Sequence, residues 1–166
     1  IRGDATGGYN KLGIAAGLRA ITVFTDRTDL TIELTYSQRG SRNDASEPTL
    51  IQINLNYIEV PFIFHYKDWL IEDKDYYKVQ AAFGLTFSRL LKGEHDNRIG
   101  EIVEKTSDWV SNDIGMLLGA EFFFNQHWSL SGRWNTSFNL LSEAKNSPSK
   151  NTLRGYFISF RLNYTF

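Results

Sequence analysis

Large apolar and aromatic side chains occupy every second position in several long stretches of the chain. At the C-terminal end these positions are Tyr156, Ile158, Phe160, Leu162, Tyr164 and Phe166. The residues between them are polar or small, except for Phe157. A period of two over this length is typical of a β-strand with one face in an apolar medium and the other in a polar medium. The same pattern predicts seven strands, at about 9–23, 29–40, 50–67, 76–91, 112–125, 127–141 and 153–166.

The third of these strands, 50–67, changes its apolar parity part-way along. Its apolar residues are Ile51, Ile53, Leu55 and Tyr57 on one parity, and Ile58, Val60, Phe62, Phe64 and Tyr66 on the other. A change of parity needs an extra residue in the ladder, and Pro61 has no N–H to donate to a neighbouring strand. We therefore expect a β-bulge near Tyr57 and Ile58.

Two classes of fold contain alternating strands of this kind. Soluble sandwiches and lipocalin-like barrels turn the apolar face inward, whereas membrane barrels turn it outward to lipid. The polar faces here are rich in Gly, Ser, Ala, Asn and Thr with isolated charges, while soluble surfaces usually carry many Lys and Glu. The aromatic residues also gather at the strand ends, as in membrane interfaces. We predict an all-β fold, a transmembrane antiparallel up-and-down β-barrel that occupies residues 1–166 as a single domain.

Composition narrows the alternatives further. The 166 residues include 18 Lys and Arg, 19 Asp and Glu, and no Cys, so the charge balance indicates no nucleic-acid partner and cysteine chemistry is excluded. Mean hydropathy is −0.33, yet aromatic residues make up 14% of the chain. No apolar run reaches the roughly 18 residues that a transmembrane helix needs. Averaging over two opposed strand faces explains why the overall hydropathy resembles that of a soluble protein.

The connections between the predicted strands alternate in length. They are short at 24–29, 67–75 and 125–127, and long at 40–49, 92–108 and 142–152. Outer-membrane barrels have short periplasmic turns and longer extracellular loops, so we predict this orientation in the cell outer membrane. The predicted periplasmic aromatic girdle consists of Phe24, Tyr66, Trp69, Tyr76, Phe124 and Trp128.

The strand count predicts a further segment. Bacterial single-chain barrels have an even number of strands with both ends in the periplasm, whereas seven strands place the start of the first one outside. We therefore expect a signal peptide and a first strand ahead of Ile1, with 1–8 as the tail of the first external loop. In the complete barrel this gives eight strands.

An eight-stranded barrel has a bore just wide enough to be filled by side chains. The polar parity places in that bore Arg19, Glu33, Glu59, Glu121, Arg133 and Arg161, with Lys11, His65 and Lys78 as further candidates. Because isolated charges are costly to bury, we expect these acids and bases to neutralise one another. Two interpretations remain open: a structural plug, or an ion path or ligand site.

One pair of residues raises the possibility of catalysis. His127 and Ser129 form an H-x-S arrangement that is similar to that of the lipid A deacylase barrels, but the wider motif of those enzymes is absent. A catalytic Ser needs a base within hydrogen-bonding reach. We predict no catalytic residue, metal site or cofactor, and keep a membrane-embedded lipid hydrolase that uses His127 and Ser129 as the alternative.

Three segments resemble one known family. The chain reads ELTYSQRG at 33–40, LNYIEVPFIFHY at 55–66 and RLNYTF at 161–166. Together they are similar to the PorT-type outer-membrane β-barrel family of Bacteroidota, although Arg39 stands where that family often has Lys. The resemblance implies a non-enzymatic scaffold or accessory subunit of an outer-membrane complex, in some members related to type IX secretion or gliding. A small channel or ligand carrier through the Glu/Arg lumen is a further alternative.

The final residue carries a separate signal. An alternating last strand that ends in Phe166 resembles the recognition signal of the barrel assembly machinery. The expected partners are therefore this machinery, outer-membrane lipid and lipopolysaccharide, and the other proteins of the complex.

Overall fold

The structure is a computed structural model that describes residues 12–42, 51–97, 101–104, 110–138 and 155–166. Its strands are β1 (Ala15–Thr25), β2 (Thr28–Arg42), β3 (Ile51–Ile71), β4 (Tyr76–Asn97), β5 (Glu101–Glu104), β6 (Asn112–Phe123), β7 (Trp128–Ser137) and β8 (Tyr156–Tyr164). A short 3-10 helix, η1 (Glu72–Lys74), joins β3 to β4. Among the residues described, no helix is long and apolar enough to cross a membrane.

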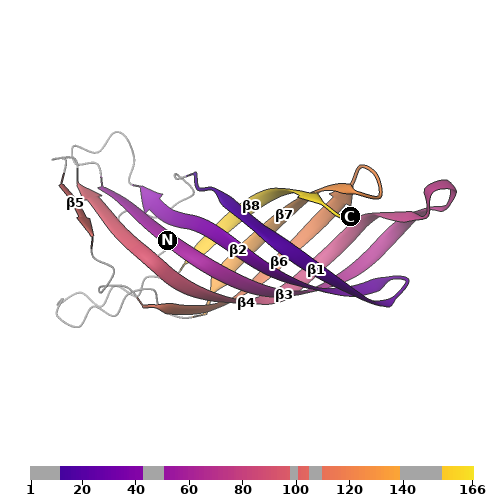
Figure 1. The fold of residues 1–166 in the computed structure, drawn as a ribbon, viewed down its shortest axis with the longest axis horizontal. Coiled ribbons are helices and arrows are strands. Elements are labelled where there is room, and N and C mark those ends of the chain that lie inside the picture. The colour runs from indigo at the N-terminus through magenta and orange to yellow at the C-terminus, as the bar shows by residue number, and fades with distance from the viewer. Residues whose placement is uncertain (1–11, 43–50, 98–100, 105–109, 139–154) are drawn as a thin grey trace.

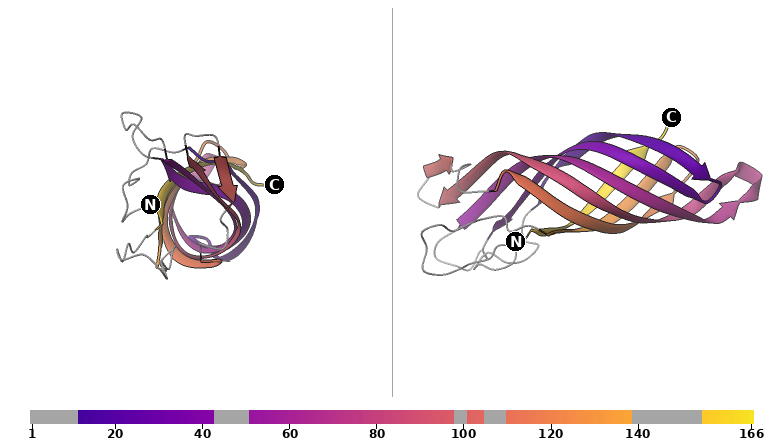
Figure 2. Two further views of the ribbon diagram at one scale, coloured as in Figure 1. Left: turned by 90° about the vertical axis from the view of Figure 1, so that its left-hand side faces the viewer. Right: turned by 90° about the horizontal axis from the view of Figure 1, so that it is seen from below.

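The strands form one antiparallel sheet that curls around a central axis (Figures 1 and 2). Seven strands follow one another in the order β1-β2-β3-β4-β6-β7-β8, and the short β5 pairs with the outer part of β4. The predicted all-β, up-and-down architecture is therefore confirmed. We call this curved sheet the wall. Turns at 26–27, 72–75 and 124–127 lie at one of its ends, which we call the short-turn end. The opposite end, where the longer connections begin, is the loop end.

The two faces of the wall differ as the period-two pattern predicts. Polar residues with inward parity are buried, including Thr31, Glu33 and Thr35 of β2. Apolar residues of the other parity are exposed on the outside, among them Leu34, Phe62, Phe64, Phe83, Leu85, Leu118, Leu130, Ile158 and Phe160. Register pairs neighbouring members of each set, such as Phe64 with Phe83. The outside of the wall is thus a continuous apolar surface.

The change of apolar parity in β3 has a different cause from the one expected. Ile53, Leu55 and Tyr57 are buried, and so is Glu59, so the inward face of β3 continues through Tyr57 and Ile58 without interruption. The bulge expected near Tyr57 and Ile58 is present, because the register of β3 against β4 shifts between Asn56 and Tyr57. Asn56 pairs with Lys92 and Tyr57 with Leu90, so the extra residue is Leu91 of β4 and not a residue of β3. The apolar positions of β3 change parity because the interior that its inward face meets is apolar at the loop end and polar farther in.

Pro61 interrupts the hydrogen-bond ladder between β2 and β3. The pairing of β2 with β3 runs from Thr28 to Ile32, and resumes at Thr35, which lies opposite Glu59. Pro61 falls in the gap because it lacks the N–H that the ladder needs. On its other side, Pro61 keeps its position opposite Thr86 of β4.

At the loop end, β2, β3 and β4 continue past the other strands of the wall, with β2 38–42 paired to β3 52–56. Pairing of β4 with β6 stops at Arg89, whereas its pairing with β3 continues to Asn97, and β5 then folds back along β4. We call this extension, β3 51–56 with β4 92–97 and β5, the arm. Part of the predicted loop 92–108 is therefore a hairpin. At the other end, β3 runs on to Ile71, so the predicted connection 67–75 is reduced to a tight turn.

Two small apolar clusters lie on the inward face. One consists of Ile53, Leu55, Tyr57 and Leu90, at the base of the arm. The other consists of Ile63, Ala82 and Leu117, and lies nearer the middle of the wall. The interior is thus built of alternating apolar and polar layers.

The outward face gives a test of the lipid-facing wall. Phe83 lies in the middle of β4 with 54% of its surface exposed. We expect Phe83→Arg to lower the free energy of unfolding in lipid vesicles by about 2–4 kcal/mol, because a charge near the bilayer midplane loses its hydration. Leu91→Arg, at the loop end, is the control and should cost about 0–1 kcal/mol. Equal costs in urea titrations of the two variants would contradict a lipid-facing wall.

Candidate functional site

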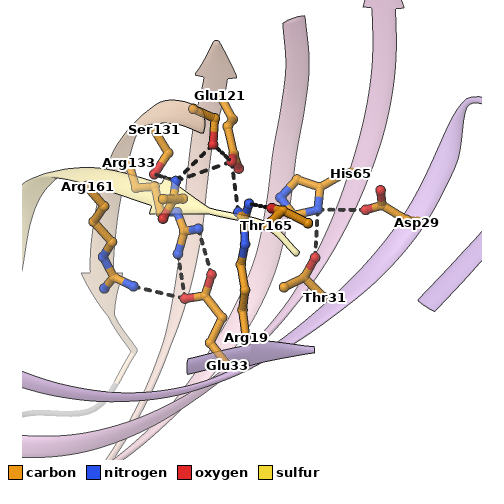
Figure 3. Close-up of polar contacts among 12 residues, drawn as sticks. Arg19, Asp29, Thr31, Glu33, His65, Glu121, Ser131, Arg133, Arg161 and Thr165 are labelled. Carbon is orange, nitrogen blue, oxygen red and sulfur yellow. Dashed lines mark hydrogen bonds and ion pairs between the residues drawn. The ribbon is translucent and has the colours of Figure 1, made fainter. Parts of the chain in front are cut away.

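The centre of the bore is a three-residue ion cluster (Figure 3). Glu33 of β2 accepts hydrogen bonds from both terminal nitrogens of Arg133 on β7, each at 2.7 Å, and from Nη1 of Arg161 on β8 at 2.9 Å. Only 1% of the Arg133 side chain and 5% of the Glu33 side chain are exposed. A bidentate pair of this kind is strong and directional, so it fixes both side chains. Three of the predicted lumen residues therefore meet here.

Gly119 provides the space for this cluster. It lies on β6 directly opposite Arg133. A Cβ at Gly119 would lie 2.6 Å from the carbonyl oxygen of Gly132 and 3.0 Å from Cγ of Arg133. A larger residue would therefore displace the guanidinium from Glu33.

A second ion layer lies nearer the short-turn end. Glu121 accepts a hydrogen bond from Nη1 of Arg19 at 2.8 Å and another from Ser129. Asn163 donates to the same carboxylate oxygen at 3.2 Å. The second terminal nitrogen of Arg19 reaches Thr165, at 2.5 Å. Arg19 of β1 is thus connected directly to the far end of the sheet.

The third layer, toward the loop end, is organised by Arg39. Its guanidinium contacts Glu59 at 2.8 Å and Asp113 at 3.1 Å. It also lies over the rings of Tyr57, at 4.7 Å, and Phe157, at 4.4 Å, so cation–π contacts cover its faces. Phe157, the exception to the polar parity of the last strand, therefore has a place inside the bore.

Arg39 and Asp113 were not among the predicted lumen residues. Glu59 was predicted there, but its partner was not. A signal for Arg39 was present, because it lies two residues beyond Ser37 on the same parity as Glu33. Arg39 was not counted among the inward residues because it lies next to the end of the predicted strand 29–40.

A fourth group closes the short-turn end. Nδ1 of His65 lies 2.8 Å from Asp29 and 3.1 Å from the hydroxyl of Thr31, and Lys67 pairs with Asp29 at 3.0 Å. His65 is therefore in the lumen, as predicted, while Asp29 and Lys67 were not anticipated.

The two remaining lysine candidates are not part of these layers. The ammonium group of Lys78 lies over the rings of Trp69, at 4.7 Å, and Phe122, at 5.4 Å, both of which are exposed. The prediction of a lumen position for Lys78 is wrong. Pairing of β4 with β6 begins only at Val79, so at Lys78 the strand β4 has only β3 as its neighbour. The end of β3 is irregular at this level, where Trp69 has a φ of 60°. Lys11 lies outside the described residues.

The described ion layers are balanced and closely packed. Their acids are Asp29, Glu33, Glu59, Asp113 and Glu121, and their bases are Arg19, Arg39, Lys67, Arg133 and Arg161. Two cavities beside Arg39 have volumes of only about 10 and 30 Å³. Such volumes hold one or two water molecules. Beside Arg39 the described interior is therefore filled and held by paired charges, whereas a groove of about 730 Å³ lies next to Arg19, Glu33 and Arg161.

Aromatic residues surround the short-turn end. All predicted girdle residues lie there, and Phe24, Tyr66, Trp69, Phe124 and Trp128 are exposed. Tyr76 is half-buried, and its hydroxyl donates to the carbonyl oxygen of Phe124 at 3.3 Å.

Arg27, in the turn between β1 and β2, lies beside these aromatic residues, which we call the aromatic belt. Hydrogen bonds with Tyr66 and Tyr77 raise the pKa of Arg27, a side chain that is positively charged at neutral pH. A cation beside exposed aromatic rings is typical of a membrane–water interface.

The C-terminal residue extends the aromatic belt. Phe166 is fully exposed, and its ring lies 5.1 Å from that of Tyr164, edge to face. Tyr164 in turn contacts Trp128 at 5.0 Å and stacks on His127 at 5.7 Å. The predicted assembly signal is thus accessible at the short-turn end.

His127 and Ser129 have separate partners. Nδ1 of His127 lies 2.9 Å from the carbonyl oxygen of Thr165 at the exposed end of the wall. Ser129 is fully buried and donates to Glu121. The hydrogen bonds of these two residues do not join them as a nucleophile and its base. Among the described residues there is also no group of three His, Cys, Asp or Glu arranged to hold a metal ion.

Comparison with known proteins agrees with this architecture. The family model described as "Outer membrane protein beta-barrel domain" matches residues 4–143. The chain belongs to this family. Searches of curated proteins and of solved structures find no match.

Membership of the outer membrane protein β-barrel family explains why the wall has its apolar side chains outside and its polar side chains inside. The family's location is the outer membrane, where an apolar exterior faces lipid and a polar interior is shielded from it. The match covers all of β1 to β7, and so includes the Glu33–Arg133 pair.

The central cluster gives a second prediction. Glu33→Leu leaves both Arg133 and Arg161 without their carboxylate, so we expect the free energy of unfolding to fall by about 3–5 kcal/mol. The matched control is Lys92→Gln, which removes a half-exposed pair with Glu94 and should cost about 0–1 kcal/mol. Urea unfolding in detergent measures both. A cost for Glu33→Leu no greater than that of the control would contradict a structural role of the cluster.

Proposed function

We propose that this barrel is a non-enzymatic scaffold or accessory subunit of an outer-membrane protein complex. Its short turns face the periplasm and its long loops and arm face outward. In this proposal it recognises its partners through its outer surfaces, and its bore has a structural role.

The filled bore is the observation that carries the proposal. Paired charges cross it at Arg39–Asp113, Arg133–Glu33 and Arg19–Glu121. A conducting or ligand-carrying barrel needs an open path or an enclosed site of several hundred Å³. The cavities beside Arg39 are far smaller than that, and the larger groove, of about 730 Å³, lies between the outer edges of the sheet, beside Arg19 and Arg161. Surfaces are then the part of the molecule available for recognition.

The arm is the outer surface best suited to bind another protein. It is a three-stranded extension whose inner side is stabilised by Ile53, Leu55 and Leu90. Rigid elements that project beyond a barrel present a fixed shape to a partner, at a lower entropic cost than a mobile loop. Its outermost strand, β5, pairs with β4 alone among the described residues and leaves its other edge open to strand addition.

The segments 33–40, 55–66 and 161–166 support a more specific assignment. Their similarity to the PorT-type family of Bacteroidota favours a complex related to type IX secretion or gliding. In this proposal the aromatic belt contacts outer-membrane lipid, the outer rim contacts lipopolysaccharide, and the exposed Phe166 is recognised by the barrel assembly machinery.

Partner capture tests the scaffold proposal. We expect specific proteins to copurify with the full-length barrel from native outer membrane in mild detergent. Replacing Glu94–Glu104 with a short Gly-Ser turn removes part of the arm and should reduce this capture at least tenfold. The control replaces Glu72–Lys74 at the opposite end and should leave capture unchanged. Absence of any specific partner from the native preparation would contradict the proposal.

Conductance tests the channel alternative. We expect the purified protein to give no stable current steps in planar lipid bilayers, because its lumen charges are paired across the bore. A porin reconstituted in parallel shows that the membranes report insertion. Reproducible steps that change on Arg39→Ala would favour an ion path through the lumen.

Lipid hydrolysis tests the remaining alternative. We expect outer-membrane lipid to be unmodified by the wild-type protein and by Ser129→Ala, as measured by mass spectrometry of lipid extracts. His127→Ala serves as the matched variant for the proposed base. A hydrolysed lipid that is present with the wild type and lost in both variants would establish the enzyme and overturn the scaffold role.

A further inference from the structure

Lys78 is a cation at the short-turn end that contacts aromatic rings in place of an acidic partner. Its ammonium group lies 4.7 Å from the ring centroid of Trp69 and 5.4 Å from that of Phe122. Among the described residues Lys78 forms no ion pair, whereas Lys67, at the same end, pairs with Asp29 in the bore at 3.0 Å. The charge of Lys78 is therefore free to attract an anion from outside the chain.

The backbone of β3 holds the ring of Trp69 beside Lys78. Asp68 pairs with Val79 of β4, and Trp69 follows Asp68, so Trp69 lies opposite Lys78. Trp69 has a φ of 60°, in the left-handed region that bulky residues rarely adopt, and its N–H donates to the carboxylate of Asp68 at 2.8 Å. Backbone outliers of this kind are found preferentially at functional sites. The result here is an indole ring, 59% exposed, against a cation.

The level of Lys78 along the wall matches the head groups of a bilayer. Phe83, in the middle of the lipid-facing part of β4, lies five residues farther along the strand. At ~3.3 Å per residue and a strand tilt of ~40°, this separation spans about 13 Å along the membrane normal. Half the height of an apolar band of about 25 Å is nearly the same distance. The ammonium group therefore lies where hydrocarbon gives way to head groups.

The chemistry around Lys78 favours an anionic ligand with apolar chains. An ammonium group has three N–H donors and no acceptor, and lysine binds phosphate as a point charge. The ring faces of Trp69 and Phe122 already contact a cation, so they do not attract a positively charged head group. Toward the membrane centre, Phe122 and Leu118 continue the exposed apolar surface along β6. A phospholipid has its phosphate and its acyl chains in this same order.

Arg27 adds a second positive charge at this end. It is exposed, hydrogen-bonds to Tyr66 and Tyr77, and forms no ion pair with the described residues. Tyr77 is the neighbour of Lys78 in β4. A guanidinium has five N–H donors, so two phenolic partners leave others for the head-group region. Two cations at one membrane surface attract anionic lipid more strongly than one.

We propose that Lys78, Trp69 and Phe122 form a binding site for the phosphate group of one phospholipid, in the leaflet at the short-turn end. Lys78 donates to the phosphate oxygens, the two rings hold its side chain in place, and Phe122 and Leu118 contact the acyl chains. Arg27 increases the attraction without being part of the site. This site rests on the lipid contact proposed above for the aromatic belt, and it is independent of the scaffold role.

The distance from Lys78 to lipid phosphorus tests the site. The full-length protein, with isotope-labelled lysine, is reconstituted in vesicles of phosphatidylethanolamine and phosphatidylglycerol, and solid-state NMR measures dephasing of each ammonium signal by phosphorus. We expect the signal that is lost in Lys78→Gln to lie about 4 Å from phosphorus, because hydrogen bonds from ammonium to phosphate oxygens are about 2.8 Å long. The control is the signal that is lost in Lys67→Gln, which should not be dephased because Lys67 binds Asp29. Dephasing at Lys78 no stronger than at Lys67 would overturn the site.

Contact with acyl chains and binding of free phosphate are measured separately. Phospholipids brominated on their chains should quench the tryptophan fluorescence of the wild-type protein. Quenching without dephasing at Lys78 would overturn the phosphate site and leave the lipid contact of the belt in place, whereas absence of quenching would overturn both. Inorganic phosphate added in detergent without phospholipid should give no dephasing at Lys78. Equal dephasing by free phosphate would overturn a lipid as the ligand.

Lipid retention gives a second measurement of the same site. Native mass spectrometry of the protein released from these vesicles should show about fivefold less bound phospholipid for Lys78→Gln, the loss expected when one cation near an anionic surface is removed. Lys78→Arg should retain lipid as the wild type does. The matched control is Lys74→Gln, in the exposed η1 turn, which should leave retention unchanged. Equal retention in Lys78→Gln and Lys74→Gln would contradict the proposal.

Discussion

The carboxylate of Glu33 holds together parts of the wall that are distant along the sheet. It binds Arg133 through two hydrogen bonds and Arg161 through a third, and so joins β2 to β7 and β8 across the bore. Charges in such an interior are stable only when each has a partner at hydrogen-bonding distance. The length of these side chains therefore limits how far apart the opposite walls can lie. A side chain at Gly119 would meet the carbonyl oxygen of Gly132 and Cγ of Arg133.

The other features of the interior follow the same constraint. Arg39 joins Glu59 to Asp113 near the loop end, and Arg19 joins β1 to Glu121 nearer the short-turn end. Apolar clusters separate these layers and fill the space between them. Around Arg39 the interior leaves no room for transport, which is why the proposed function depends on the arm and the other outer surfaces. The outer face of the wall needs only to be apolar where it contacts the lipid chains.

The surrounding bilayer adds to the cost of an unpaired charge in the interior, because lipid keeps water away from the wall. Arg19 of β1 and Arg161 of β8 avoid this cost by reaching across the bore to Glu121 and Glu33.

Period-two alternation by itself determined the fold class, the approximate strands, the apolar exterior and six charged residues of the lumen. It did so because a strand's parity decides which of two media each side chain meets. Only the tertiary structure decided the partners across the bore, such as Asp113 for Arg39, because such pairs depend on register and curvature summed over several strands. It also placed the bulge at Leu91 and moved Lys78 out of the lumen, since the ends of β3 and β4 extend beyond their other neighbours. Alternation shows on which face of the sheet a side chain lies, whereas the curling of the sheet brings side chains of distant strands into contact.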